Sequence, residues 1–178
     1  MHSRALELVE EGLPAAERHA IAEAVGQAAL RFYLLRVDPT KNIVFDPAES
    51  IELKGFTGPF LQYGLVRAQR LLEKAAEKGF DPRMEAPPPI IEPTEEKLLQ
   101  QLYGLPEVLV AAARSFDPAL LAHYGYELTR RYNEFYQTLP VLAAEPRVRS
   151  FRLSLTQAYK VAMETVMETL SLPVPSRM

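Results

Sequence analysis

Apolar residues recur at helical spacing along most of the chain, and prolines and glycines separate the stretches that carry this pattern. Several of these stretches begin next to a proline, which suits the first turn of a helix. Helices are therefore expected over residues 4–12, closing at Gly12, and over 14–35, 59–75, 95–105, 108–116, 118–138 and 146–170, with the sequence LPE separating 95–105 from 108–116. The pattern predicts an all-α bundle.

In three of these helices the apolar residues fall on one face, which is the face that a bundle buries. The expected buried faces are Ile21, Val25, Ala28, Phe32 and Leu35; Leu121, Tyr124, Leu128, Tyr132 and Phe135; and Val148, Phe151, Leu155, Ala158 and Ala162. Each helix is expected to pack through that face alone.

The helix that follows the sequence GFTGPF carries two stripes. Thr57 is placed to cap it and Pro59 suits its first position, so it is expected to begin near Pro59. At about 100° per residue, the residues divide into an apolar stripe, Leu61, Leu65, Ala68, Leu72 and Ala75, and a second stripe, Phe60, Tyr63, Arg67, Arg70 and Lys74. Rings that stack on bases beside cations that meet phosphates are typical of a site for single-stranded nucleic acid. The other interpretation is a solvated charged face with half-buried rings, and the helix by itself favours it because basic helix faces are common.

Two segments interrupt the helical pattern. Residues 37–54 contain two Asp-Pro turns and short β-branched pieces, which predict a structured connection with a brief extended segment. Residues 78–94 contain five prolines and no periodicity, which predicts an exposed surface loop.

Composition limits the class of protein. A length of 178 residues, with 48% hydrophobic and 24% charged residues, suits one soluble domain with a substantial core. The net charge of −3 argues against a protein that coats nucleic acid without specificity, so any RNA contact must be local. The chain has no cysteine, no signal-peptide pattern and no apolar run of membrane-spanning length. A cytoplasmic protein with no membrane partner is therefore expected.

A search for catalytic chemistry gives no candidate site. His2, His19 and His123 are scattered along the chain and are interpreted as surface or packing residues, not as metal ligands. The glycines of GFTGPF do not match a phosphate-binding loop. The adjacent Glu95 and Glu96 are expected in the first turn or on the exposed face of a helix, where negative charge suits the helix dipole. No catalytic residue, metal site or cofactor site is expected in this chain.

Two motifs are similar to those of one enzyme family. GFTGPFLQYGLVR, residues 55–67, resembles the G-x-T-G-P-[YF]-L-Q-Y-x-x-x-R signature of arginyl-tRNA synthetases, and LAHYGYELTRRYNEFY, residues 121–136, resembles their Y-x-Y-E-L-x-x-x-[FY]-N-x-F-Y stretch. The final RM is also typical of that family. The resemblance extends over essentially the whole chain. It implies a helical bundle of the anticodon-binding type found in class I aminoacyl-tRNA synthetases, formed as a single domain over 1–178, with lead-in helices and a connector over 1–54 and the main bundle, including loop 78–94, over 55–178.

The resemblance implies that the chain recognises the anticodon loop of arginine tRNA and so serves ATP-dependent arginyl-tRNA synthesis by a parent enzyme. The catalytic signatures of the family are absent from the sequence. ATP and arginine are therefore expected to bind a catalytic domain outside this chain, and the chain alone is expected to be inactive. It is expected to be a C-terminal piece of a longer enzyme, with a free-standing paralogue as the less favoured alternative. Its expected partners are arginine tRNA and that catalytic domain, without DNA binding, and it is expected to be monomeric.

The family's anticodon contacts imply specific residues here. In the family, the rings at the start of the helix after GFTGPF and the tyrosine of the N-x-F-Y stretch face splayed anticodon bases, and the central cytosine is read in a pocket near them. The matching positions in this chain are Phe60, Tyr63, Tyr136 and Met178, together with Arg67 and Asn133. Arg67 is expected to meet a phosphate or an acidic neighbour, and Asn133 either serves the site or ties helices together. The tail is expected to fold back, to place Met178 near Tyr136 and Phe60 or Tyr63, and to leave Arg177 available to a phosphate or a carboxylate.

Other tyrosines and some departures from the family pattern point elsewhere. Tyr124, Tyr126 and Tyr132 are assigned to the core because a helical aromatic stripe usually packs. Phe56 and the sequence Gly64-Leu65-Val66 depart from the family pattern. These departures favour an alternative, a helical protein-interaction module that keeps the scaffold without binding RNA. The retained rings and the terminal methionine favour the RNA-binding interpretation.

Overall fold

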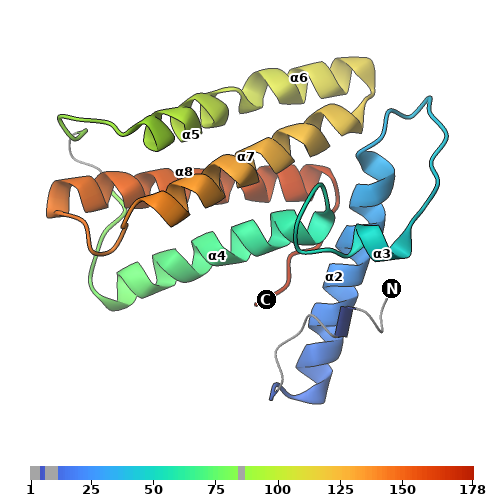
Figure 1. The fold of residues 1–178 in the computed structure, drawn as a ribbon, viewed down its shortest axis with the longest axis horizontal. Coiled ribbons are helices and arrows are strands. Elements are labelled where there is room, and N and C mark those ends of the chain that lie inside the picture. Colours follow the sequence, from blue (N-terminus) through green and yellow to red (C-terminus); the bar gives the residue numbers. More distant parts are fainter. Residues whose placement is uncertain (1–4, 7–11, 84–86) are drawn as a thin grey trace.

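All regular elements of the computed structural model are helices (Figure 1). The structure describes residues 5–6, 12–83 and 87–178, and no strand occurs among them. The helices are α2 (Ala15–Leu35), α3 (Pro47–Ser50), α4 (Gly58–Glu77), α5 (Pro93–Tyr103), α6 (Leu105–Ser115), α7 (Pro118–Thr138) and α8 (Pro146–Thr169). The predicted all-α class is confirmed. Most of the short helix expected over 4–12 lies outside the described residues.

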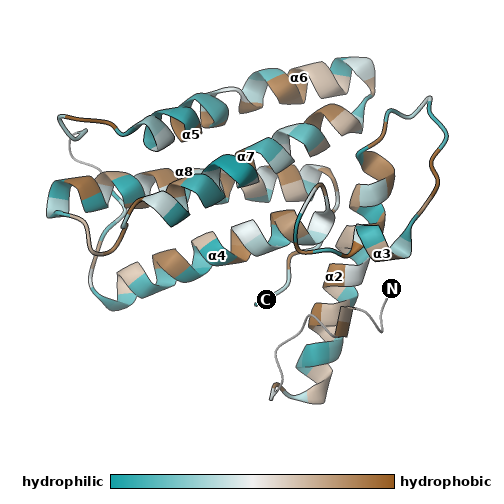
Figure 2. Ribbon diagram, viewed as in Figure 1, coloured by the Kyte–Doolittle hydropathy of each residue, from teal (hydrophilic) through white to brown (hydrophobic). Residues whose placement is uncertain are grey.

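Helices α4, α7 and α8 pack against one another and form the centre of the bundle. Figure 1 shows α5 and α6 arranged end to end along α7, and α2 crossing the bundle at the end where α4 begins. Apolar and polar residues alternate along α4 in Figure 2, as expected for a helix with one buried and one exposed side. This arrangement leaves an outward-facing seam between α4 and α7.

Local sequence explains where the helices begin. The Thr57 hydroxyl accepts a hydrogen bond from the Phe60 N–H at 3.3 Å, and α4 starts at Gly58, so the prediction of a helix beginning near Pro59 is confirmed. The expected break at LPE is wrong, because residues 105–107 form the first turn of α6 and the boundary falls at Gly104. A proline is tolerated in a first turn, where its missing N–H has no partner to lose.

The two interrupting segments differ from expectation in detail. Residues 37–54 contain the short helix α3, whose N-cap Asp46 accepts the Ala48 N–H at 2.7 Å, and they form no strand. The proline-rich loop is largely exposed in its described parts, as predicted. Phe80 is the exception, since its half-buried ring packs against the core and the Arg149 guanidinium lies 3.8 Å from the ring centroid.

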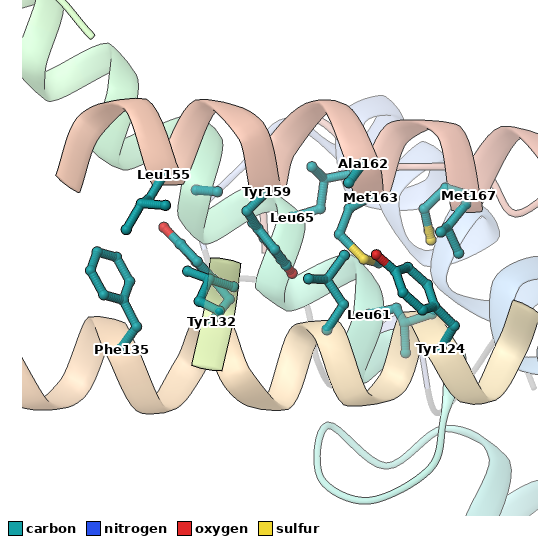
Figure 3. Packing of buried hydrophobic residues seen from close by; sticks show 14 of the residues in the cluster. Leu61, Leu65, Tyr124, Tyr132, Phe135, Leu155, Tyr159, Ala162, Met163 and Met167 are labelled. Carbon is teal, nitrogen blue, oxygen red and sulfur yellow. The ribbon is translucent and has the colours of Figure 1, made fainter. Parts of the chain in front are cut away.

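The core lies where α4, α7 and α8 meet, and its aromatic centre comes from α7 and α8 (Figure 3). The rings of Tyr132 and Tyr159 stack with centroids 3.9 Å apart and planes 5° from parallel. Burial raises the pKa of both phenols, so both side chains stay neutral. The predicted face of α7 is confirmed in full. In the predicted face of α8, Val148 is only half-buried and Ala158 is wrong, since it is exposed while the neighbouring Tyr159 is fully buried.

The predicted faces of α2 and α4 are confirmed apart from their edges. Leu35 and Leu72 are half-buried, and Leu71 is buried beside the expected stripe of α4. Helix α2 serves two apolar clusters. Ala28 and Phe32 join the main core, and a second cluster consists of Ala5, Ile21, Ala22, Val25, Ala29 and Ile51. The division at residue 54 stays a prediction.

Gly64 is required by a close helix contact. A Cβ atom at this position would lie 2.5 Å from Thr129 Cγ2 and 2.6 Å from the Tyr159 hydroxyl. The Tyr159 hydroxyl donates to Thr129 Oγ1 at 3.2 Å, so both obstructing side chains are held in place. This contact gives the departure at Gly64 a packing explanation.

Gly64→Ala is expected to lower the free energy of unfolding by about 1–3 kcal/mol, because it overpacks a filled core. Thermal or urea unfolding of the purified chain measures the change. Gly26→Ala is the matched control: no atom lies within 4 Å of the added Cβ, so it should raise stability by up to about 1 kcal/mol. Adding Tyr159→Phe and Thr129→Ser should restore part of the loss at Gly64, and no recovery would contradict the steric explanation.

Glu95 lies in the first turn of α5, as expected, and its burial is a finding of the structure. Its side chain is 1% exposed and its Oε1 accepts from Arg152 Nε at 2.6 Å, whereas Glu96 is exposed as expected. Glu95 Oε2 also accepts the Glu92 N–H at 2.7 Å, which caps α5. One carboxylate therefore joins a helix cap to a buried ion pair between α5 and α8.

Candidate nucleic-acid interface

A small hollow opens on the seam between α4 and α7, and the C-terminal tail forms part of its wall. We call it the α4–α7 hollow. It is lined by Tyr63, Val66, Arg67, Arg70, Leu71, Lys74, Tyr136 and Met178. Its volume is about 210 Å³, below the roughly 300–1,000 Å³ of ordinary small-molecule pockets. The hollow therefore suits one flat ring better than a larger ligand.

Helical spacing brings the side chains of α4 together. Tyr63, Arg67, Arg70 and Lys74 are separated by three or four residues, so they lie on one face of the helix. On the opposite wall, Tyr136 of α7 is 38% exposed. The two walls of the hollow are held in place by the buried faces of both helices, because Leu65 of α4 and Tyr132 of α7 pack in the same core (Figure 3).

Arg67 lies at the centre of the predicted site. Its guanidinium carbon is 4.6 Å from the Tyr63 ring centroid and 5.0 Å from the Tyr136 ring centroid. Its Nη1 donates to Asn133 Oδ1 at 2.6 Å. Arg67 makes no ion pair with a described residue, so the expected acidic neighbour is replaced by Asn133. Asn133 thereby ties α7 to α4, one of the two roles expected for it.

The electrostatics of the hollow differ from those of the whole chain. Arg67, Arg70 and Lys74 contribute three cations, and no aspartate or glutamate is among the lining residues. The chain as a whole has a net charge of −3. A local positive site on an acidic protein can bind an anionic segment without making the protein bind every polyanion.

Phe60 lies outside this hollow. Its ring contacts Tyr126, with centroids 5.4 Å apart, and Tyr126 contacts Phe56 at 5.1 Å. Phe56 also lies against His123 at 4.4 Å and Phe32 at 5.1 Å. Phe56 is therefore a packing residue, which explains this departure from the family pattern. The anticodon role of Phe60 stays a prediction, as do the roles of the five residues gathered at the hollow.

The other tyrosines follow their predicted assignment. Tyr124 is buried, and its hydroxyl donates to the Gln101 carbonyl at 2.8 Å. Burial raises the pKa of Tyr124 to about 12. Tyr132 is fully buried, and the half-buried Tyr126 packs against the same core. The core assignment is confirmed.

The tail folds back against the bundle, as predicted. Figure 1 shows the chain returning from the end of α8 to a position beside α4 and α2. Met178 lines the hollow with Tyr63 and Tyr136, and Arg177 Nε lies 3.0 Å from Glu17 Oε1 of α2. The expected carboxylate for Arg177 is thus Glu17.

The sequence did not identify Val66 and Leu71 as lining residues, because a stripe of polar residues does not show how far its apolar neighbours extend.

The described part of the chain was also compared with the requirements of a metal site and of a membrane-spanning helix, and it meets neither. No group of three or more His, Asp or Glu side chains is placed to hold a metal ion there. No helix that the structure describes is both long enough and apolar enough to cross a membrane.

Comparisons with known proteins agree with this fold. The model of a family described as the DALR anticodon binding domain matches residues 61–178. Arginine–tRNA ligases of Porphyromonas gingivalis and Parabacteroides distasonis are 37% and 38% identical over 98% and 91% of this chain. The arginyl-tRNA synthetase structure of Thermus thermophilus is 31% identical, with a TM-score of 0.88 over 99% of this chain. That of Plasmodium falciparum, at 17% identity and a TM-score of 0.80 over 99% of the chain, shares the fold.

The helical fold and the matched model define the chain as an anticodon-binding domain of the DALR class. The identities narrow the assignment, and the chain belongs to the arginyl-tRNA synthetase family. It spans 30% and 28% of the length of the two curated ligases and 31% of each of the two solved structures. The resemblance read from the two sequence motifs is confirmed.

Proposed function

We propose that the chain binds the anticodon loop of arginine tRNA through the α4–α7 hollow. The observation that carries this proposal is the arrangement of Arg67 between the rings of Tyr63 and Tyr136, at the edge of a hollow with no carboxylate side chain. A splayed base can stack on such rings, and the adjacent Arg70 and Lys74 suit the phosphates on either side of it.

The proposed role in the whole enzyme is recognition. Binding of the anticodon loop holds the acceptor end of the tRNA at a catalytic domain that uses ATP and arginine. The relatives are arginine–tRNA ligases, which supports this reaction for a parent enzyme. The residues of this chain contribute by stacking, by charge and by fixed position.

Titration of the 178-residue chain against arginine tRNA and a non-cognate tRNA is expected to show tighter binding of the former. The hollow has three cations, and each phosphate contact with a single strand contributes a slope of roughly −0.7. The logarithm of the association constant K should therefore fall with the logarithm of the salt concentration with a slope of about −2. Fluorescence anisotropy at several salt concentrations measures both quantities. Equal weak binding of both tRNAs would favour the alternative, a helical scaffold whose partner is a protein.

A further inference from the structure

The last residues of the chain are attached to α2 and α4 as well as to the end of α8. After α8 the chain turns at Ser171, and the Leu172 N–H closes the turn on the Met167 carbonyl at 2.8 Å. The Ser171 carbonyl accepts a hydrogen bond from Arg31 Nη1 of α2. The start of the tail is thus held by both α8 and α2.

Gln62 makes the most buried of these attachments. Its side chain is fully buried, and Nε2 donates to the Ala24 carbonyl of α2 at 3.1 Å and to the Pro173 carbonyl of the tail at 2.6 Å. Its Oε1 has no hydrogen-bond partner among the described residues. The two carbonyl oxygens require this amide orientation, because the reverse orientation would place Oε1 against both of them. A buried acceptor without a partner costs stability. The burial of Gln62 is therefore explained by the two hydrogen bonds that its Nε2 group donates.

Two further contacts fix the path from Pro173 to the chain end. Pro175 is buried, and its ring limits the backbone to an extended conformation. Arg177 then pairs with Glu17 of α2. The next residue, Met178, lies in the wall of the α4–α7 hollow and also packs against the second apolar cluster, on α2.

We propose that Gln62 and Glu17 are positioning residues for RNA recognition, because they hold the tail so that Met178 completes the α4–α7 hollow. This inference rests on the proposed function. Neither side chain lines the hollow, so each acts through Met178. Glu17 and Ala24 lie outside the matched family region, residues 61–178. Helix α2 is therefore part of the RNA site although no α2 residue lines the hollow.

Holding the tail in place favours RNA binding because it lowers the conformational entropy that the tail would otherwise lose on binding. An unattached chain end samples many conformations, and fixing each residue costs conformational entropy. The attachments at Pro173 and Arg177 supply that ordering before RNA arrives. A flexible methionine beside two rings can then fill the space that a bound base leaves.

The first test uses Gln62→Met, which keeps the volume of the side chain and removes both donors. In ¹³C-methyl-methionine protein without RNA, the Met178 methyl resonance should move toward the position of a free chain end, because it leaves the rings of Tyr63 and Tyr136. Affinity for an arginine tRNA transcript should fall about two- to tenfold, the range for losing the one hydrogen bond that holds the tail, from Gln62 Nε2 to the Pro173 carbonyl. The variant Gln62→Met, Met178→Ala should bind no more weakly than Met178→Ala alone.

A milder second variant avoids the core. Glu17→Gln removes only the half-buried ion pair with Arg177, and affinity should fall about two- to fivefold. Glu23→Gln is the matched control, since Glu23 lies on the same helix, is exposed, and bonds only to Gln27 at 3.0 Å among its described contacts. It removes the same charge without touching the tail. The difference between the two variants should vanish in the Met178→Ala background.

The outcomes separate this inference from the proposed function. Tyr63→Ala tests the hollow by itself, so a loss of affinity there with no change in Gln62→Met and Glu17→Gln overturns the positioning role and leaves the function intact. An unmoved Met178 resonance in folded Gln62→Met, or losses that add fully to that of Met178→Ala, also overturns it. An intact chain with no preference for arginine tRNA overturns both.

Discussion

Arg152→Met is expected to lower the free energy of unfolding by about 3–5 kcal/mol, the usual effect of leaving a buried charge without its partner. Arg152 Nε donates to Glu95 Oε1 at 2.6 Å, and Arg152 Nη1 donates to the Pro140 carbonyl at 2.7 Å. Side-chain exposure is 8% for Arg152 and 1% for Glu95, so water cannot replace the lost guanidinium. Urea unfolding followed by circular dichroism measures the difference.

Two comparisons test the electrostatic explanation. Glu95→Gln combined with Arg152→Met should be more stable than Arg152→Met alone, because a neutral amide needs no counter-charge and can still cap α5. Arg130→Met removes an arginine from the exposed pair with Glu127, 2.9 Å apart, and should change stability by no more than about 1 kcal/mol. If both arginine variants lose the same stability, burial of the ion pair is not the cause.

The sequence was sufficient to predict the helices, because each has a local cause. Thr57 and Asp117 accept hydrogen bonds from the first turns of α4 and α7, and prolines stand in the first turns of most helices. The spacing of apolar residues identified the buried face of α7 without error. Local signals of this kind depend on residues three or four positions apart, which the sequence shows directly.

The errors arise where a neighbour far along the chain decides the outcome. Tyr159, not Ala158, enters the core because Gly64 of α4 leaves room for its hydroxyl. The burial of Glu95, which its first-turn position did not indicate, likewise depends on Arg152, 57 residues later. A helical stripe shows the direction of the core and not its width, so residues at the edge of a stripe were assigned less well.

In the candidate site too, contacts within one helix could be predicted from the sequence and contacts between helices could not. Tyr63 and Arg67 share a helix face, and their proximity follows from their spacing. The contact of Arg67 with Asn133 and Tyr136 crosses between helices, and only the family motifs pointed to those residues together. Phe60 was grouped with Tyr63 by the same spacing, but its contact with Tyr126 draws it toward the packed cluster around Phe56. Gln62 stands in the family signature, but neither its contact with the tail nor that of Glu17 could be read from helical spacing.

Tyr63→Ala and Tyr136→Ala are each expected to weaken binding of arginine tRNA by about 1–3 kcal/mol, the range measured when a stacking ring is removed. Tyr63→Phe and Tyr136→Phe should retain most of the affinity, because the ring face is kept and only the hydroxyl is lost. Tyr103→Ala is the matched control, since this ring is 85% exposed on α5 and does not line the hollow. Anisotropy titrations, corrected for the folded fraction, measure all five variants.

The salt dependence of the same variants distinguishes stacking from charge. Loss of a ring that stacks on a base should reduce affinity by the same factor at every salt concentration, because no phosphate contact is lost. Arg70→Gln should instead weaken binding most at low salt and reduce the slope of log K against log salt by about 0.7 if one phosphate of a single strand is released. Arg67 combines both effects, because its guanidinium lies against both rings and carries charge. If the tyrosine variants unfold while affinity per folded molecule is unchanged, these rings serve the core and the RNA site lies elsewhere.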